Sequence, residues 1–421
     1  MIKDYMADSP FPGAIPRASG GGGRKQNFVA YIFLIFTFLS IIFWLQQQLD
    51  FNLSLDLGMP VPDIVNISET FDNLINTGGL NQEGNQFIGL TILYGWAWLL
   101  HPALCFLVNI VLMAWATNLY NNFFIRKLGA PSWSILGVLG NPYLALAMIG
   151  PNKEIPLLLL TLIFFRAIIE RRSGWFLIGV ATCLAVFVFR EGYGIYLGII
   201  LIILLIPKVS SRALVILTFI ICFATSVSFG LLDSIFPFIL GKNKDIFEML
   251  DGGSLAVGAF ASILGLDPST ALGGGVLFFL RAIYNILTMA LFPVLQNTIG
   301  IHWIGLAYWL FGLMVLICMS SCIVTLVSMK PLRSPVLVAA ALSIGTWFVI
   351  SVSLFVQPRY LMPIFPLAIF VLACSPPRTR TRSILVPLIF TGLVIFTYSL
   401  LDRVPALADP DSFDMPSYIL N

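Results

Sequence analysis

The chain has 421 residues, of which 58% are hydrophobic and only 10% are charged, and its formal net charge is +3 at pH 7. Soluble globular proteins carry roughly 25% charged residues, so a soluble fold of this length could not bury so much apolar surface. The composition therefore excludes an ordinary soluble protein and indicates a chain that lies in a lipid bilayer, where a spanning helix needs about 20 mostly apolar residues.

The first 27 residues are polar and rich in proline and glycine, and they end in Gly20–Gly23 followed by Arg24 and Lys25. They show no cleavable signal sequence, and the first long apolar run follows them directly. Residues 1–27 are predicted to form a disordered cytoplasmic tail.

The apolar runs that follow predict an all-α polytopic membrane protein with about eleven transmembrane helices. Runs of about 15 residues are included, because polar helix ends can reach the interface and a bilayer can thin locally. Two further apolar stretches, 87–101 and 274–296, decide the topology. The predicted spans are 28–46, 103–124, 131–150, 155–170, 174–189, 192–207, 213–232, 303–329, 335–356, 361–375 and 383–401.

Basic residues near the helix ends set the orientation, because cytoplasmic loops carry an excess of Lys and Arg. When both ambiguous stretches are interfacial helices on the outer face, 16 of the 23 basic residues but only three of the 20 acidic residues lie inside. This arrangement predicts a bacterial inner-membrane protein with its N-terminus in the cytoplasm and its C-terminus outside. The transmembrane domain is then 28–401, with long outer loops at 47–102 and 233–302 and an acidic outer tail at 402–421.

The sequence offers little material for several kinds of site. All six cysteines lie in apolar runs without a Cys-x-x-Cys pair, and there are only two histidines, His101 and His302. A disulfide framework or a histidine-based metal site is therefore not supported. There is also no P-loop and no dinucleotide-binding glycine pattern, so neither a nucleotide-driven step nor a nucleic-acid partner is expected.

The first outer loop contains six acidic residues and no Lys or Arg. Such acids usually serve solubility, but Asp63 follows the stiff segment Pro60–Pro62 and lies between a spanning and an interfacial helix. At the membrane surface its carboxylate would act as a general base on an acceptor hydroxyl. It would alternatively hold a divalent cation, Mg²⁺ or Mn²⁺, beside a lipid phosphate. Glu69 and Asp72 are rival candidates for the same role.

Five further candidates lie on the same predicted face. Lys153 and Glu154 occupy the tight turn between the third and fourth spans, where they either form a salt bridge or bind phosphate and support catalysis. Arg281, in the interfacial stretch, needs an anionic partner such as a lipid phosphate. Arg359 offers a planar bidentate donor for phosphate, with Tyr360 beside it as a hydrogen-bonding group. Interfacial anchoring is the alternative for Arg359 and Tyr360.

The neighbouring charges Arg190 and Glu191, at the outer end of the fifth span, are interpreted as a structural pair. The other candidates converge on the outer face, whereas the inner face carries only topogenic charge. A phosphate-binding group of cations beside carboxylates favours a donor that is an activated lipid.

The chain at this point resembles the GT-C superfamily of membrane glycosyltransferases, in its protein mannosyltransferase-like and aminoarabinose transferase-like branch. The resemblance covers most of residues 28–375 and rests on order and spacing. The segments that carry it are Pro62-Asp63, Arg126-Lys127-Leu128-Gly129, Asn141-Pro142, Asn152-Lys153-Glu154 and Arg359-Tyr360 with Pro363 and Pro366. The family often has a tyrosine four residues after the first-loop Asp, and here that position is Ile67.

The resemblance implies that Asp63 is catalytic, that Glu154 is the second-loop acid, and that Arg359 binds the donor phosphate, with Arg281 a weaker candidate. It implies a glycosyltransferase that takes a polyprenyl-phosphate-linked sugar at the outer face and transfers it to a glycan or lipid-linked acceptor in cell-surface polysaccharide assembly. Two alternatives stay open: a polymerase of lipid-linked oligosaccharide repeats and a flippase for lipid-linked glycans.

Overall fold

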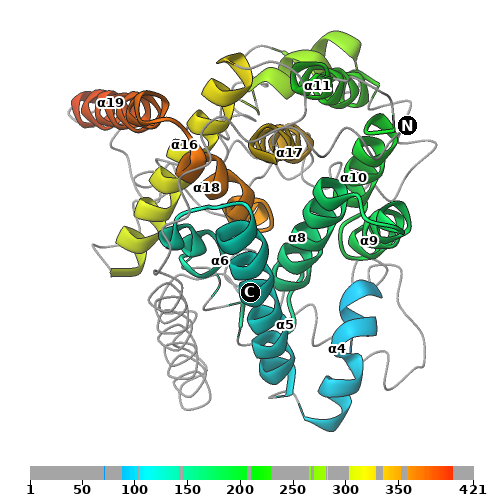
Figure 1. Cartoon of the computed structure of the whole chain (residues 1–421). Coiled ribbons are helices and arrows are strands. Elements are labelled where there is room, and N and C mark those ends of the chain that lie inside the picture. The colour runs from blue at the N-terminus through cyan, green and yellow to red at the C-terminus, as the bar shows by residue number, and fades with distance from the viewer. Residues whose placement is uncertain are drawn as a thin grey trace, which may run out of the picture.

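All regular elements of the described part of the chain are helices, as the predicted all-α class requires (Figure 1). The structure, a computed structural model, describes residues 71, 88–101, 104–141, 144, 147–148, 150–205, 210–228, 265–266, 270–280, 282, 303–328, 335–351 and 358–401. The helices are α4 (Ile88–Leu100), α5 (Leu104–Tyr120), the π-helix η2 (Asn121–Lys127), η3 (Ser132–Ile135), α6 (Leu136–Leu139), α8 (Glu154–Glu170), α9 (Trp175–Phe189), α10 (Glu191–Ile203), α11 (Ser211–Val227), α16 (Trp303–Ser328), α17 (Pro335–Ser351), η4 (Pro358–Leu361), α18 (Phe365–Cys374) and α19 (Pro377–Leu401).

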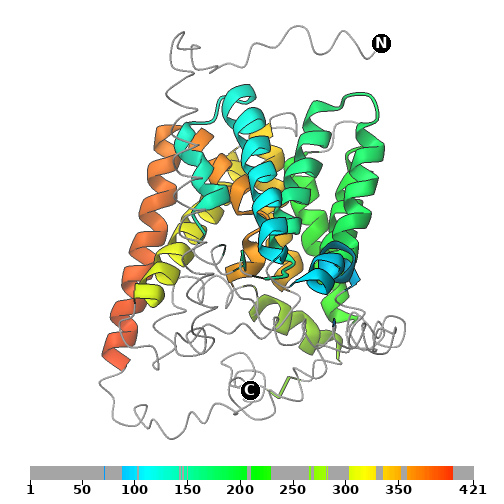
Figure 2. The same ribbon diagram turned by 90° about the horizontal axis from the view of Figure 1, so that it is seen from below.

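The long helices lie side by side in a bundle, and helices joined by short connections, such as α8, α9 and α10, run in opposite directions (Figure 2). Helix α17 packs against α10 and α11 on one side and α16 and α18 on the other, and so connects the helices before and after it in the chain. Close packing here depends on Gly345, since a Cβ at that position would lie 1.8 Å from the hydroxyl of Tyr196.

Helix α4 lies across one end of the bundle rather than along it (Figures 1 and 2). It packs against α5 and α9. Gly89 permits this approach, because a Cβ at residue 89 would lie 2.8 Å from the ring of Phe189. The stretch 87–101, predicted as an interfacial helix, is thus helical over Ile88–Leu100 and crosswise to the bundle. A second short helix, Ala271–Leu280, overlaps the beginning of the other stretch predicted to be interfacial, 274–296.

Two predicted spans differ from the observed helices. The run 131–150 is not one helix, because α6 ends at Leu139 and both Gly140 and Asn141 lie outside regular structure. Pro142 explains the break, since a proline disfavours helical backbone in the residue before it. The last helix begins at Pro377 and not at residue 383, because a proline is well accommodated in the first helical turn.

Every charged residue that the structure describes lies toward one of the two ends of the bundle. We call one end the basic end; it carries Arg126, Lys127, Arg166, Glu170, Arg171, Arg172, Arg212, Arg378, Arg380 and Arg382. We call the other the Glu154 end; it carries Lys153, Glu154, Arg190, Glu191 and Arg359. The described middle of the bundle holds no charged side chain.

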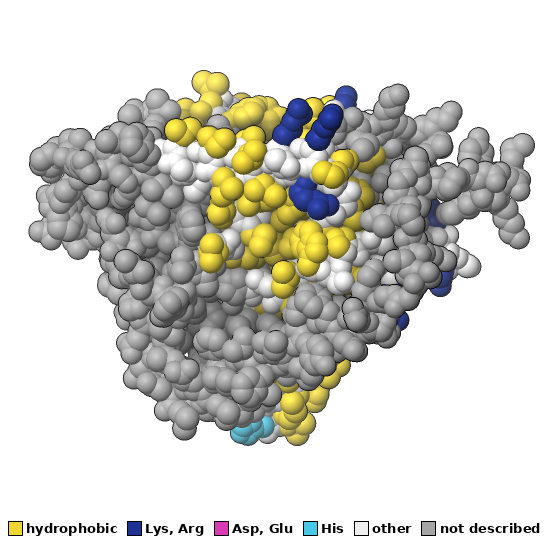
Figure 3. All heavy atoms as spheres, turned by 60° about the vertical axis from the view of Figure 1, so that its left-hand side comes forward, with side chains coloured by type: hydrophobic (Ala, Val, Ile, Leu, Met, Phe, Trp, Pro, Cys, Tyr) yellow, Lys and Arg dark blue, Asp and Glu magenta, His cyan; other side chains and the backbone are white. Residues whose placement is uncertain are grey.

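Hydrophobic side chains cover much of the described lateral surface. Leu107, Val111 and Trp115 follow one side of α5 and are each more than half exposed. Figure 3 shows a broad hydrophobic area with Lys and Arg, but no described Asp or Glu, beside it. Two described helices are long and apolar enough to cross a membrane, Leu104–Lys127 and Leu310–Val327. The other apolar helices among the described residues are shorter.

Candidate functional site

The described members of the predicted site lie together at the Glu154 end. Lys153 and Glu154 begin α8, and Arg359 and Tyr360 belong to η4. Asp63 and Arg281 lie outside the described residues, as do the rival acids Glu69 and Asp72. The structure therefore brings the second-loop acid and the Arg-Tyr segment to one end, and the predicted roles of Asp63 and Arg281 stay predictions.

Glu154 is a buried acid without a partner. The residue is only 8% exposed, and its carboxylate makes no hydrogen bond or ion pair with any residue that the structure describes. The salt bridge with Lys153 that the sequence allowed does not form. Its position in the first turn of α8 is electrostatically favourable, because the helix N-terminus carries partial positive charge. Burial of an unpaired carboxylate nevertheless costs free energy, and such groups concentrate at functional sites.

A fully buried asparagine fixes the turn that leads to Glu154. The Nδ2 atom of Asn109, in α5, donates to the carbonyl oxygens of Ala147, Met148 and Gly150 at 3.2, 3.1 and 2.8 Å. Its Oδ1 atom accepts a hydrogen bond from the hydroxyl of Tyr94 at 2.6 Å. One side chain thus ties α4 and α5 to the backbone of residues 147–150, which leads into α8.

Asn152 completes the turn. Its Nδ2 atom donates to the carbonyls of Ala147 and Gly150 at 2.5 and 3.0 Å, and its Oδ1 accepts the backbone N–H of Ile155 at 2.9 Å. The last bond satisfies one of the free donors at the start of α8, as a helix-capping asparagine does. Glu154 is therefore held on a rigid support.

Tyr94 links α4 to this acid. Burial, together with the nearby Cys105 and Glu154, raises the pKa of Tyr94 well above its usual value of 10. The tyrosine therefore stays protonated, and its hydroxyl donates to Asn109. Helix α4 thus covers the Glu154 turn with a neutral hydrogen-bonding group.

Arg190 is the residue that the sequence interpretation missed. Its guanidinium carbon lies 4.1 Å from the ring centroid of Tyr360, in a cation–π contact between two segments far apart in the sequence. It forms no ion pair with Glu191, contrary to the predicted structural pair, or with any other described acid. Only a three-dimensional contact reveals this role; the available sequence signal was an arginine at the outer end of an apolar run.

Two contacts connect the segments that hold Glu154 and Arg190. The hydroxyls of Thr161 in α8 and Tyr193 in α10 are 2.9 Å apart. Helix α4 packs against α5 and α9, and its Gly89 lies against Phe189, the residue before Arg190. Glu154 and Arg190, neither with a counterion among the described residues, thus lie at the same end of the bundle.

No described cluster of three or more His, Cys, Asp or Glu residues is placed to hold a metal ion. The predicted divalent cation rests on Asp63, which lies outside the described residues. Glu154 is a single described carboxylate, so the described residues do not build a site for Mg²⁺ or Mn²⁺, which prefer several oxygen ligands.

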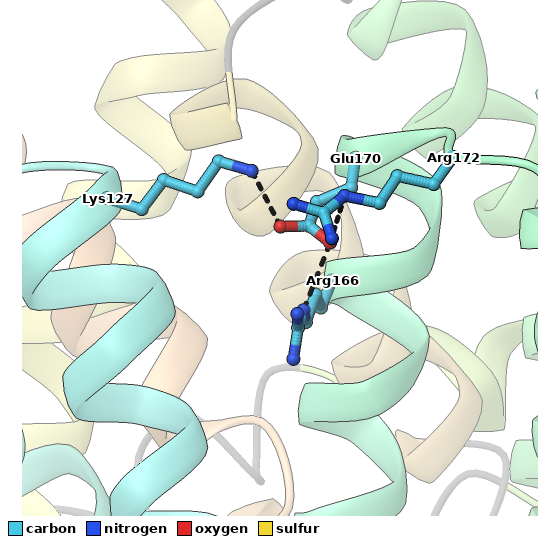
Figure 4. Close-up of polar contacts among 4 residues, drawn as sticks. All are labelled: Lys127, Arg166, Glu170 and Arg172. Atoms are coloured by element: carbon cyan, nitrogen blue, oxygen red, sulfur yellow. Dashed lines mark hydrogen bonds and ion pairs between the residues drawn. The ribbon is translucent and has the colours of Figure 1, made fainter.

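The basic end presents a different arrangement (Figure 4). Glu170 is contacted there by Lys127 at 2.6 Å, Arg166 at 3.1 Å and Arg172 at 3.4 Å. Burial acts to raise the pKa of this carboxyl, but the hydrogen bonds from Lys127 and Arg166 outweigh it and lower the pKa below its usual value. An acid with three cationic partners is suited to holding helix ends together, not to catalysis.

No protein-family model matches the chain, and no curated protein or solved structure is significantly similar to it. The argument on function accordingly rests on the residues of this chain.

Proposed function

We propose that the chain is a polytopic membrane glycosyltransferase that takes its sugar from a polyprenyl-phosphate donor at the outer face of the bacterial inner membrane. The observation that carries the proposal is the unpaired, 8%-exposed carboxylate of Glu154 at the end of the bundle where the half-buried Arg190 also lacks a described counterion. A catalytic carboxylate and a phosphate-binding cation must be kept apart from each other so that both can meet substrate.

The charges at the two ends of the bundle support the proposed placement in the membrane. In the described chain, nine basic residues and one acid lie at the basic end, which we assign to the cytoplasm. The Glu154 end then faces outward, with α4 at the outer interface. Helices such as α10 and α18 are short for a bilayer, and local thinning together with polar helix ends accommodates them. The proposal keeps about eleven spans, the first of which lies outside the described residues.

In the proposed reaction, the acceptor hydroxyl oxygen attacks the anomeric carbon as the bond from that carbon to the phosphate oxygen breaks. Asp63 takes the proton from the hydroxyl, and Glu154 assists by holding the acceptor or accepting the proton. The polyprenyl phosphate leaves with an added negative charge. Arg359, Arg281 and Lys153 are proposed to stabilise that charge, since cations aimed at a leaving oxygen lower the barrier.

A flippase for lipid-linked glycans is less well supported. Transport paths through membranes are marked by polar or ionisable residues at mid-depth. The described middle of the bundle has no charged residue, and the charges gather at its ends. A polymerase of lipid-linked repeats would use the same chemistry with a longer acceptor, and the length of the product separates it from a single-sugar transferase.

The test is a transfer assay with purified protein in nanodiscs, supplied with a radiolabelled pool of polyprenyl-phosphate sugars and candidate acceptors. Wild type is expected to move label to an acceptor, and Asp63→Asn and Arg359→Ala are expected to lose transfer while remaining folded. Transfer at the wild-type rate in both variants would remove these residues from the mechanism. Movement of labelled lipid across the bilayer without transfer would identify a flippase instead.

A further inference from the structure

We infer that Arg190, stacked on Tyr360, is a phosphate-binding residue at the Glu154 end. This inference rests on the proposed function, which it deepens by naming a ligand group for the donor that the sequence interpretation did not include. The ligand chemistry is a phosphate mono- or diester, as in polyprenyl phosphate or its sugar-linked form.

The first argument is the position of the guanidinium. Its central carbon lies 4.1 Å from the ring centroid of Tyr360, a distance at which the planar group stacks on the ring face. Stacking uses the face of the guanidinium and leaves the N–H donors at its edge directed outward. Those donors form a fork that matches two phosphate oxygens.

The second argument is charge. Arg190 is half-buried, and no described carboxylate lies within ion-pairing distance. A partly desolvated cation with no counterion is unfavourable unless an anion joins it. Glu191, the next residue, begins α10 and does not pair with Arg190. The fold thus keeps a cation available that its nearest acid could have neutralised.

The third argument is rigidity. Arg190 is the single residue between α9 and α10, with extended backbone at φ −156° and ψ 97°. Its N–H donates to Val186 at 2.7 Å, and its carbonyl accepts the N–H groups of Tyr193 and Gly194 at 3.1 and 3.0 Å. Gly194 lets the helices approach, since a Cβ there would lie 2.4 Å from the backbone of Phe187. The side chain therefore starts from a fixed backbone, as a preorganised ligand site requires.

Tyr360 connects Arg190 to the segment that is proposed to bind the donor phosphate. It follows Arg359, the residue proposed to bind the donor phosphate, so the stacked contact brings the loop of Arg190 to the η4 segment. The segment that contains Arg359 and the residue between α9 and α10 therefore meet at one place in the fold. Charge-assisted, bidentate contacts of this kind are the strongest phosphate contacts that a protein makes.

The experiment measures binding of polyprenyl phosphate to the full-length protein in nanodiscs by microscale thermophoresis, with polyprenol and inorganic phosphate as comparison probes. The variants are Arg190→Ala, Arg190→Lys, Tyr360→Phe and Tyr360→Leu. The matched control is Arg171→Ala, which removes another arginine–aromatic contact, 5.3 Å from the ring of Trp175, at the basic end. Thermal unfolding of every variant is recorded in parallel.

We expect Arg190→Ala to weaken polyprenyl phosphate binding by about tenfold or more, and Arg190→Lys to weaken it less, because Lys offers a point charge without the fork. Tyr360→Leu should weaken binding by about threefold because the ring face is lost, and Tyr360→Phe, which keeps the ring, should weaken it less. Arg171→Ala should bind like wild type. If inorganic phosphate binds comparably and its binding also depends on Arg190, the site recognises the phosphate group alone. If only polyprenyl phosphate binds, the site recognises the phosphate together with the polyprenyl chain.

Unchanged binding in Arg190→Ala would overturn the inference, and a loss of thermal stability alone would assign the guanidinium to the fold. Equal binding of polyprenol and polyprenyl phosphate would overturn it as well. Arg190-dependent phosphate binding without any sugar transfer would leave the inference standing while the proposed function fails. Sugar transfer at the wild-type rate in Arg190→Ala would leave the proposed function standing, whereas the inference about Arg190 would fail.

Discussion

The two ends of the bundle use their charges in opposite ways. At the basic end six of the nine described basic residues have polar partners: three contact Glu170, and three others donate to carbonyl oxygens at the C-termini of neighbouring helices. The capping contacts are Arg171 to Leu204 of the segment after α10, Arg212 to Leu326 and Val327 of α16, and Arg380 to Leu372, Ala373 and Ser375 at the end of α18. Charges that mark topology in the sequence thus also secure helix ends.

At the Glu154 end, Glu154 and Arg190 have no counterion among the described residues, although neutral side chains there form many hydrogen bonds. Asn109, Asn152 and Tyr94 are saturated with hydrogen bonds, whereas Glu154 and Arg190 have no counterion. Neutral side chains hold the backbone in place, and Glu154 and Arg190 are available to contact a substrate. The comparison teaches that position in the membrane alone does not identify a functional charge; the state of its partners does.

The strongest test of this difference between the two ends is to replace one acidic residue at each end. Glu154→Gln keeps the shape of the side chain but removes a base, so we expect sugar transfer to fall by about 10²- to 10⁴-fold with little change in the thermal unfolding midpoint. Transfer of label from polyprenyl-phosphate sugar measures the effect.

Glu170→Gln is the matched control at the basic end. It removes the acid that holds three cations, and we expect transfer to remain within a fewfold of wild type while the unfolding midpoint falls. If both substitutions lower transfer equally, or Glu154→Gln leaves it intact, the functional distinction between the ends is wrong.

The next largest effect is expected from the support under Glu154. Asn109→Ala leaves the carbonyl of Met148 without its side-chain donor and the hydroxyl of Tyr94 without its acceptor, and it removes one of two donors from the carbonyls of Ala147 and Gly150, so it should destabilise the fold by about 3 kcal/mol. Tyr94→Phe removes one bond of the same network and should cost about 1 kcal/mol. Denaturant unfolding in detergent measures both, and an Asn109→Ala loss no greater than that of Tyr94→Phe would contradict the network.

The sequence predicted the helical class and the turn positions better than the helix lengths. Apolar runs bounded by Gly, Pro and charged residues located every long described helix, since lipid admits few other structures. The break after α6 was readable from Pro142 but was placed inside a span, because the apolar composition of 131–150 outweighed one proline in the interpretation. The early start of α19 at Pro377 was missed because its arginines were taken for loop residues.

The site was predictable only where the chain itself brings residues together. Glu154 stood out because a short turn at the membrane surface contains it. Arg190 did not, since its partner Tyr360 is distant in sequence and no local pattern records the contact. Asn109 lies in an apolar run and reads as a tolerated polar residue; its role depends on backbone carbonyls exposed by a helix break some 40 residues later. Partners of this kind follow from packing, which a pattern along the chain does not encode.

A smaller effect is expected at the basic end, where the stability of the fold should depend on pH through Glu170. Glu170 is the last residue of α8, at the basic end, and its pKa in the folded protein is lowered. A depressed folded pKa contributes stability that is present above the unfolded pKa and is lost as pH falls through the folded pKa. We expect wild type to lose about 1 kcal/mol of stability on acidification through this range. Glu170→Gln should not show that part of the loss, and parallel pH profiles of the two unfolding midpoints would contradict the assignment.

The smallest effects are expected from the capping arginines, taken one at a time. A cation at a helix C-terminus stabilises by about 0.3–1 kcal/mol, so Arg212→Ala and Arg380→Ala should each lower the unfolding midpoint slightly and leave transfer unchanged. Because the two arginines cap different helices, α16 and α18, their losses should add in the double variant. Lys in place of either arginine should recover part of the loss, since the helix end requires a positive charge more than a planar fork. A capping variant that abolishes transfer without lowering stability would show that the basic end also takes part in the reaction. The distinction between a functional Glu154 end and a structural basic end would then be wrong.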